Sequence, residues 1–344
     1  MMLPPLTTVD ELDEVLSRPT PGVLRTLTAI PDDIAVLGAG GKMGPTLCWM
    51  LRRAFDELGQ TDRRVFAVSR FSSAAPAEWL QQRKIDVVRC DFLDRAAVAA
   101  LPDIPNLIFM AGQKFGTQSD PSATWVANTI VPAIIAERYP KARMVALSTG
   151  CVYPLKPWQG PGSDETDALG PPGDYANSCV GRERVLTYFA QRHHSPLMLV
   201  RLCYAIDLRY GVLLDLAQKI WCGQPVDLAM GATHVIWQGD ANARIIECLG
   251  RATDPPSAVN LTGRERLLIR DLARRLGELL DRPVHFTGGE APTAWVWNAD
   301  KSYEWFGPPE VALEEMLAAT AAWIRGGGAT LNKPTHFEVR DGQF

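Results

Sequence analysis

A glycine-rich turn between an apolar run and a helical pattern constrains this chain more than any other feature. The run Ile34–Leu37 leads directly into Gly38, Gly41 and Gly44, which are spaced three residues apart. This order predicts a strand, a phosphate loop and a helix. Gly38 allows a sharp turn, Gly41 lets a pyrophosphate approach the backbone, and Gly44 lets the helix pack closely on a sheet. Glycines also mark ordinary turns, so the rest of the chain has to support this interpretation.

Composition excludes several classes of protein. The chain has 344 residues, of which 47% are hydrophobic and 22% charged, as in a globular protein with one large core or two ordinary domains. A net charge of −4 gives no field that would attract nucleic acid or an anionic membrane. The sequence shows no basic start followed by an apolar block, and no segment as long as a membrane-spanning helix. We therefore expect a cytoplasmic protein that binds a small-molecule substrate, without nucleic-acid or membrane partners.

Cysteine and histidine usage argues against a disulfide framework and against a metal site. The seven cysteines are scattered without paired spacings, which predicts reduced and mostly buried thiols. His193 and His194 are adjacent, but they end a helical pattern, so a solvated helix end fits them better than a ligand pair. We expect no bound metal.

Apolar runs of strand length alternate with longer amphipathic stretches. The predicted strands are Ile34–Leu37, Val65–Ser69, Val87–Cys90, Leu107–Ala111, Met144–Ser148 and Leu197–Leu202. The predicted helices are Pro45–Leu58, Ala96–Leu101, Ser122–Arg138 and Tyr175–Arg192. This alternation predicts an α/β fold with a Rossmann-type, doubly wound parallel sheet that helices cover on both faces.

The same patterns divide the chain into four segments. Residues 1–30 predict an N-terminal helical arm, with Val9–Leu16 as its helix and Pro19 and Pro21 as breakers, and residues 31–202 predict the NAD(P)-binding domain. Residues 203–330 predict a smaller mixed α/β lobe for substrate, with short strands at His234–Trp237, Val259–Thr262 and Val284–Thr287. The tail, residues 331–344, can close a pocket, join a subunit interface or stay disordered.

Residues at the carboxyl ends of the strands carry the cofactor argument, because ligands bind at that edge of such a sheet. The second strand ends in Ser69 and Arg70. A hydroxyl and a guanidinium suit a 2′-phosphate and favour NADP, with NAD as the second choice, although Arg70 can equally be a solvated loop residue. The third strand leads into Asp91 and Phe92, which we place beside the adenine; a turn-capping role for Asp91 is the alternative.

Three motifs resemble those of one enzyme family. They are Phe109-Met-Ala-Gly-Gln-Lys114, Ser148-Thr149-Gly-Cys-Val-Tyr153 and Tyr175-Ala-Asn-Ser-Cys179. They are similar to the fourth-strand end, the Ser-Ser/Thr-x-x-Val-Tyr-Gly motif and the Tyr-x-x-Ser-Lys motif of the extended short-chain dehydrogenase/reductases, the NAD-dependent epimerase/dehydratase family. The likeness covers about residues 32–326 and is most specific over 34–180.

The resemblance implies an NAD(P)-dependent oxidoreductase or epimerase that transfers a hydride at a secondary alcohol or ketone. Tyr175 would then be the acid or base, and Thr149 would orient the substrate oxygen. The resemblance further implies cofactor contacts from Lys42, Met43, Ala111, Gly112, Lys114 and the helix residue Asn128. It also implies a homodimer in which helices 122–138 and 175–192 pair across a two-fold axis.

Cys179 departs from the family pattern. The family has a lysine there, which lowers the pKa of the tyrosine and binds the nicotinamide ribose, whereas a neutral thiol does neither well. Three interpretations are open. Lys114 or Arg182 supplies the missing charge, or Tyr175 acts as a neutral acid in carbonyl reduction. In the third, catalysis is lost and the chain is a non-catalytic NADP-binding sensor or regulator.

A second departure concerns the substrate. Sugar-nucleotide members commonly have an asparagine after the sixth strand and an arginine in the lobe, but this chain has Tyr204 at the first place and no arginine in Thr233–Asp240. A nucleotide-diphosphate substrate is therefore disfavoured, and a smaller polyol, sugar acid or ketone is expected. Tyr204 is the predicted substrate-binding residue, with His234 and Trp237 as further lining, although each of these is more often a packing residue.

Overall fold

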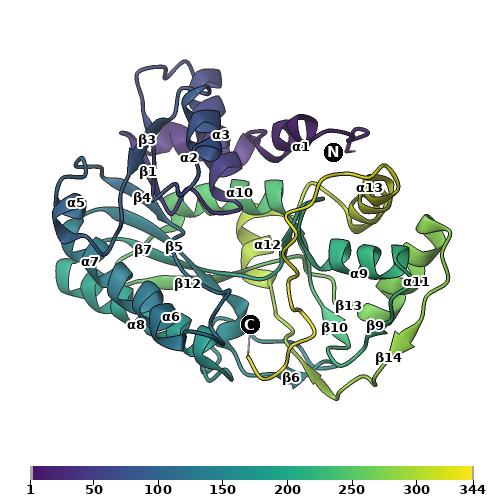
Figure 1. Ribbon diagram of the computed structural model, residues 1–344. Helices are drawn as coiled ribbons and strands as arrows, with labels where there is room; N and C mark the ends of the chain where they lie inside the picture. The colour runs from purple at the N-terminus through teal and green to yellow at the C-terminus, as the bar shows by residue number, and fades with distance from the viewer. Residues whose placement is uncertain (1–2, 343–344) are drawn as a thin grey trace.

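A parallel sheet forms the centre of the protein, as seen in a computed structural model that describes residues 3–342 (Figure 1). Within these residues the central sheet has seven strands in the order β12-β7-β5-β4-β1-β2-β3, and each pairing is parallel. In chain order the strands are β1 (Ile34–Leu37), β2 (Val65–Ser69), β3 (Asp86–Arg89), β4 (Asn106–Phe109), β5 (Arg143–Thr149), β7 (Leu197–Leu202) and β12 (Ser257–Leu261). The predicted Rossmann-type α/β fold is thus confirmed.

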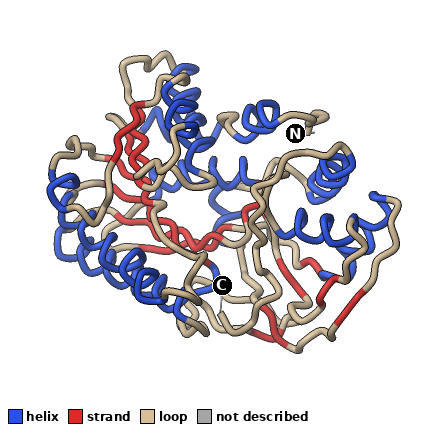
Figure 2. The backbone as a smooth tube through the Cα atoms, viewed as in Figure 1, coloured by secondary structure: helices blue, strands red, loops and turns tan. Residues whose placement is uncertain are grey.

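Successive strand residues point into two separate cores, so both faces of the sheet are covered by helices (Figure 2). Val36 and Ile108 belong to the core under α2 (Pro21–Ala29), α3 (Gly44–Glu57), α4 (Ala75–Gln81) and α10 (Gln238–Glu247). Leu37 and Phe109 belong to the core under α5 (Arg95–Ala99), α7 (Val131–Arg138) and α8 (Asp174–His193). Burial on both faces explains why β1 is apolar along its whole length.

The helix expected over Ser122–Arg138 is continuous but not regular. It consists of α6 (Pro121–Trp125), a π-helical turn η1 (Val126–Ile130) and α7. Asp120 caps its start, because its carboxylate accepts a hydrogen bond from the backbone N–H of Ala123 at 2.8 Å. Such π turns often occur at functional sites, and this one carries Asn128.

The N-terminal arm contains two helices rather than one. α1 (Val9–Leu16) starts with a capping box between Thr8 and Glu11, as an isolated short helix requires. Pro21, expected to break a helix, instead occupies the first position of α2, where its missing N–H costs nothing. Both helices pack against α10 and α3, so the arm is part of the folded body.

One strand assigned to the lobe belongs to the central sheet. The segment expected at Val259–Thr262 forms β12, which pairs in parallel with β7 from Ser257 to Leu261. A short apolar run does not reveal its partner, so the sequence pattern could not show that the chain returns to the sheet. The predicted NAD(P)-binding domain ends at residue 202, but β12, which lies later in the chain, is part of the same sheet.

The lobe is built from helices and two-stranded sheets beyond the carboxyl edge of the central sheet (Figure 1). Its main helices α9 (Val212–Trp221), α11 (Ile269–Leu280) and α13 (Leu313–Arg325) pack on one another. The paired strands are β8 (Ala205–Ile206) with β11 (Ile236–Trp237), β9 (Val226–Asp227) with β14 (Phe286–Thr287), β10 (Ala232–Thr233) with β13 (Leu267–Leu268), and β6 (Lys156–Pro157) with β15 (Thr293–Ala294).

Short helical elements complete the fold. They are α12 (Asp300–Phe306) and the 3₁₀ turns η2 (Gly150–Val152) and η3 (Cys248–Arg251). Across residues 3–342, none of the helices combines the length and the apolar character that a membrane crossing needs. All seven cysteines are free thiols, and Cys222 alone among them is exposed.

The C-terminal tail crosses the molecule from α13 towards β6, as the yellow segment of Figure 1 shows. Its Phe337 side chain is only 1% exposed and joins the core of the lobe. Arg340 donates to the carbonyl of Thr293, and a Cβ atom added at Gly173 would lie 2.5 Å from the carbonyl oxygen of Gly342. The described part of the tail is therefore packed against both the lobe and the start of α8.

Candidate active site

A cavity of about 180 Å³ lies where the carboxyl ends of the strands face the lobe and the tail. Its lining combines the phosphate loop, the ends of β5 and β7, the start of α8 and single residues from distant segments. The described lining residues are Lys42, Met43, Lys114, Ser148, Thr149, Gly150, Cys151, Tyr175, Leu202, Cys203, Tyr204, Ala205, Ile206, Tyr210, Gly211, Trp297 and Thr335. The predicted catalytic pair and the predicted substrate residue Tyr204 thus meet in one place.

The three glycines of the phosphate loop have different reasons to be glycine. Gly38 has a φ of 96°, and a Cβ atom there would lie 2.6 Å from the backbone nitrogen of Ala111. A Cβ atom at Gly44 would overlap the carbonyl oxygen of Ala39. At Gly41 the nearest atom would be 3.4 Å away, so packing within the protein does not require that glycine. Gly41 therefore leaves an open approach to the N-terminus of α3, which has no side-chain cap.

The ends of β2 and β3 lie at the same edge as the loop. Ser69 packs beside it, since a Cβ atom at Gly40 would lie 2.8 Å from the Ser69 Oγ. Arg70 is exposed at the surface. The Asp91 carboxylate accepts a hydrogen bond from the N–H of Leu93 at 3.1 Å, which is the turn-capping role considered as its alternative. Phe92 is buried.

Thr149 and Tyr175 approach each other from the end of β5 and the first turn of α8. A side-chain hydrogen bond joins the threonine hydroxyl to the tyrosine. The neighbouring Ser148 hydroxyl is engaged elsewhere, because it donates to Oε1 of Glu183 at 2.6 Å. Thr149 is therefore the hydroxyl best placed to meet a ligand beside Tyr175.

A buried polar network holds the strand ends in place beneath the cavity. Ser148, Arg201 and Asn260 lie opposite one another in the register of β5, β7 and β12. Arg201 pairs with Glu183 at 2.8 Å and donates to the hydroxyl of Tyr153 at 2.6 Å. That hydroxyl in turn donates to Oδ1 of Asn260 at 2.8 Å. Sequence analysis missed this network, because no local pattern links polar residues on three separate strands.

Cys179 lies fully buried behind Tyr175 and supplies no positive charge. Its Sγ is 4.0 Å from the Nδ2 of Asn128, and burial raises the pKa of its thiol. Arg182 sits nearby, where it donates to the carbonyl of Leu147 at 2.9 Å and to Oδ1 of Asn128. A Cβ atom at Gly112 would overlap that guanidinium, so Gly112 is needed to accommodate Arg182.

Tyr175 is held in its neutral form. Burial raises its pKa well above the ordinary value, and the thiols of Cys179 and Cys151 add to the rise. Arg182 and the hydrogen bond with Thr149 act in the opposite direction without overcoming it. The tyrosine is therefore protonated at neutral pH and is able to donate a proton.

Two lysines enter the cavity, and they come from different segments. The Lys114 Nζ donates to the carbonyl oxygen of Thr335 at 3.0 Å and lies 6.0 Å from the centre of the Tyr175 ring. The Lys42 Nζ donates to the carbonyl oxygen of Ala205 at 2.9 Å. Of the two residues considered as replacements for the family lysine, Lys114 lines the cavity and Arg182 lies behind it.

On the lobe side, Tyr204 lines the cavity but the other two expected residues do not. Tyr204 has a φ of 46° and packs edge-on against Trp297, with 5.7 Å between ring centres. His234 is buried against the carbonyl of Gly263, and burial lowers its pKa to about 4. Trp237 is only 1% exposed. His234 and Trp237 thus have the packing role that was the favoured alternative for each, because the β11 region packs into the core.

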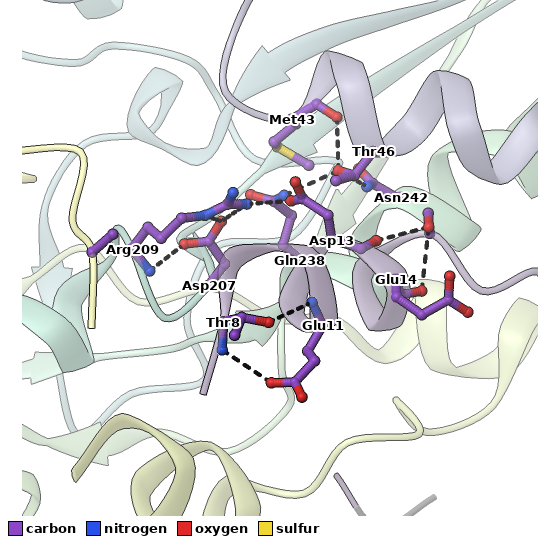
Figure 3. A network of polar contacts seen from close by, with 12 residues as sticks. Thr8, Glu11, Asp13, Glu14, Met43, Thr46, Asp207, Arg209, Gln238 and Asn242 are labelled. Carbon is purple, nitrogen blue, oxygen red and sulfur yellow. Dashed lines mark hydrogen bonds and ion pairs between the residues drawn. The ribbon is translucent and has the colours of Figure 1, made fainter. Parts of the chain in front are cut away.

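The N-terminal arm supports the lobe side of the cavity from behind. Asp13 on α1 pairs with Arg209 at 2.9 Å, and Arg209 also pairs with Asp207 at 3.0 Å (Figure 3). These ion pairs fix the loop 207–211, which brings Tyr210 and Gly211 into the cavity lining. Tyr210, Trp297 and Thr335 could not be predicted from sequence, since their placement depends on contacts between distant segments. Cys151 and Cys203 lie beside predicted site residues but were expected only as buried thiols.

Comparison with known proteins identifies the family. The sequence matches the model of the NAD dependent epimerase/dehydratase family over residues 34–206, half of the chain. The chain belongs to this family. It is a family of enzymes, and the matched region contains the phosphate loop, Thr149 and Tyr175.

Solved structures of the family share the fold with this member. A UDP-glucuronic acid 4-epimerase mutant from Bacillus cereus, in complex with NAD and a fluorinated UDP-sugar, aligns with a TM-score of 0.72 at 17% identity, over 85% of this chain and 99% of that one. The dTDP-glucose 4,6-dehydratase from Bacillus anthracis, in complex with NAD, aligns with a TM-score of 0.70 at 16% identity, over 86% and 97%. The UDP-glucose 4-epimerase from Thermus thermophilus, also with NAD, gives 0.69 at 17% identity, over 86% and 99%. No curated protein sequence matches the chain.

Proposed function

We propose that this protein is an NAD(P)-dependent reductase that transfers a hydride to a ketone of a small polar substrate. In the reverse direction it would remove a hydride from the corresponding alcohol. The observation that carries the proposal is the meeting of Thr149 and Tyr175 in one cavity beside the glycine loop. Net reduction, net oxidation and epimerisation use the same hydride transfer between a secondary alcohol and a ketone, and differ in its direction and in the steps that follow it.

The residues around the loop fit a dinucleotide. Gly41 leaves the approach to the start of α3 open, and that start has no side-chain cap, so a pyrophosphate can come close to the positive end of the helix dipole. Ser69 and the exposed Arg70 would face the adenosine ribose, and no carboxylate occupies those two positions, which favours NADP over NAD. When bound, the nicotinamide supplies the hydride donor or acceptor.

Tyr175 would act as the proton donor. The hydroxyl is protonated at neutral pH and can donate its proton to a carbonyl oxygen as negative charge develops there, although its raised pKa makes it a weaker acid than an ordinary tyrosine. The Thr149 hydroxyl would orient the same oxygen. The phenolate left behind would be stabilised by the charges of Lys114 and Arg182, in place of the family lysine that Cys179 replaces.

The cavity favours a compact substrate. A volume of about 180 Å³ is below the usual range of ligand pockets, roughly 300–1,000 Å³. Tyr204 and the tail residue Thr335 are among the residues that line it. The segment Thr233–Asp240 also lacks the arginine that sugar-nucleotide members commonly have, so a polyol, sugar acid or ketone is the proposed substrate.

One observation supports a different function, a non-catalytic sensor of NADP. The buried thiol of Cys179 stays neutral and cannot assist proton removal from Tyr175. The deciding experiment measures NADPH and NADH binding by calorimetry on cofactor-free protein, and then turnover with a panel of small hydroxy and keto compounds. Turnover supports the reductase, and tight binding without turnover supports the sensor. Failure to bind either nucleotide would contradict both.

We further propose a homodimer through α6, η1 and α8. Trp125, Val126 and Ile130 are 38%, 36% and 47% exposed, and Tyr188 on α8 is 55% exposed. Large apolar side chains gathered on adjacent helices are typical of a protein interface. Sedimentation equilibrium should give twice the chain mass, and a monomer at micromolar concentration would rule out this dimer.

A further inference from the structure

The cavity is unusual in its charge. Lys42 and Lys114 contribute charged side chains to it, and no aspartate or glutamate stands among the described residues that line it. The two ammonium groups are close enough for Lys114 to lower the pKa of Lys42. Like charges in a confined, partly desolvated space repel each other, so an anion bound between the two ammonium groups would relieve that repulsion.

Lys42 extends away from the phosphate loop that carries it. Its Nζ donates to Ala205 and lies 4.1 Å from the centre of the Tyr210 ring, and both residues follow β7 on the lobe side of the cavity. The side chain therefore points away from its own loop, towards the lobe side of the cavity. This direction places the charge beside the substrate space rather than beside the pyrophosphate position.

The carboxylates nearest to the lysines are engaged by other groups. Asp207 pairs with Arg209 at 3.0 Å. Asp215 accepts hydrogen bonds from the backbone N–H and the hydroxyl of Thr335, at 2.8 and 2.5 Å. Glu338 pairs with Lys219 at 3.1 Å. These three carboxylates favour the charged forms of the two lysines from a distance, but none of them is among the residues that line the cavity.

We propose that this cavity takes an anionic substrate, with a carboxylate or phosphate group bound between Lys42 and Lys114 and a reducible carbonyl directed at Thr149 and Tyr175. The inference rests on the proposed function for the carbonyl, but the anion site depends on the lysines alone. It narrows the substrate class from small polar compounds to keto acids and phosphorylated ketones.

The titration of Lys42 supports this assignment. Desolvation, with Arg209 and Lys114 in the same direction, lowers the pKa of Lys42 to about 8, while Asp207 opposes the shift. Burial also lowers the pKa of Lys114, against the influence of Asp215, Glu338 and the thiols of Cys151 and Cys179. A bound anion would raise both values, so binding near pH 8 to 9 must take up protons.

The test uses malonate and inorganic phosphate as probes, with glycerol as the uncharged comparison. Calorimetry on cofactor-free protein should detect binding of at least one anion and none of glycerol. Binding of malonate but not of phosphate would indicate a substrate with a carboxylate group. Binding of phosphate but not of malonate would indicate a phosphorylated substrate. Lys42→Met should lower the affinity for the anion at least tenfold. Lys141→Met, which removes an exposed lysine, should leave that affinity unchanged.

A second measurement needs no variant. Malonate does not titrate near pH 8, so heats measured there in two buffers of different ionisation enthalpy report protons taken up by the protein. Uptake of a substantial fraction of one proton per malonate is expected. Such uptake would support Lys42 as the anion ligand even if Lys42→Met failed to fold, whereas the absence of any detectable malonate or phosphate binding to the wild type would overturn the anion site.

NADPH affinity separates this inference from the proposed function. Lys42→Met should leave NADPH binding within about twofold of wild type. An equal loss of NADPH and malonate affinity, with the two competing, would assign Lys42 to the cofactor phosphates and overturn the inference. If malonate binds through Lys42 but no nucleotide binds, the proposed function fails and the anion site stands.

Discussion

The cavity has two walls of different origin. The sheet-side wall comes from the phosphate loop, the end of β5 and the start of α8, and it carries Thr149 and Tyr175. The lobe-side wall comes from Tyr204, the loop 207–211, Trp297 and the tail residue Thr335. The first is held by neighbouring strands of one sheet, and the second by contacts between segments that lie far apart in the chain.

The difference suggests a division of roles, in which the sheet-side wall carries out the reaction and the lobe-side wall recognises the substrate. The sheet-side wall is anchored by the parallel pairing of β5 with β7 and by the buried Glu183–Arg201 pair. The lobe-side wall depends on the arm through Asp13 and on the tail through Phe337, so it can vary between members that share the chemistry. We expect mutations on the sheet side to act on kcat and mutations on the lobe side to act on KM.

Tyr175→Phe should give the largest effect on catalysis. Removal of the proton donor is expected to lower kcat about 1,000-fold, within the range typical of a general acid, while the affinity for NADPH stays within twofold. Steady-state kinetics with the substrate found in the panel, together with calorimetry, measures both. Gln191→Ala, an exposed change on the same helix, is the control. A kcat that falls less than tenfold would show that another group donates the proton.

Glu183→Gln should be the most destabilising change on the sheet side. It leaves the Arg201 guanidinium buried without its counter-charge, and loss of one partner of a buried pair costs about 4 kcal/mol. Urea denaturation measures the free energy of unfolding. Glu137→Gln, which removes an exposed pair with Arg95, should cost less than about 1 kcal/mol. Equal effects of the two variants would mean that the network does not hold the strand ends.

The sheet side could be predicted from sequence because its rules are local. A strand followed by spaced glycines specifies the turn at Gly38, and the carboxyl ends of parallel strands meet at one edge, so Thr149 and the loop had to lie together. The lobe side obeys no such rule. Nothing in the sequence around Thr335 or Trp297 shows which cavity they reach, and the run at Ser257–Leu261 looked like a lobe strand until its pairing with β7 was seen.

Phe337→Ala should release the tail without unfolding the protein. A buried phenylalanine replaced by alanine costs about 3 kcal/mol, and near a chain end that cost falls on local opening. We expect faster hydrogen exchange over residues 331–342, with KM raised and kcat kept, because Thr335 leaves the cavity. Leu331→Ala, at a 39% exposed position in the same segment, is the control. Unchanged exchange in Phe337→Ala would contradict a role for this contact.

Arg70→Ala should give the smallest effect, and it tests which residue of the sheet side selects the cofactor. A charge-assisted hydrogen bond to a 2′-phosphate contributes about 1.5 kcal/mol, so NADPH should bind about tenfold more weakly while NADH, which lacks that phosphate, is unaffected. Arg95→Ala, another exposed arginine on this domain, should change neither affinity. Higher salt should weaken NADPH binding more in the wild type than in Arg70→Ala, since exposed charges are screened. If Arg70→Ala still prefers NADPH, another residue must contact the 2′-phosphate. If the wild type binds both nucleotides with equal affinity, the proposed preference for NADP is wrong.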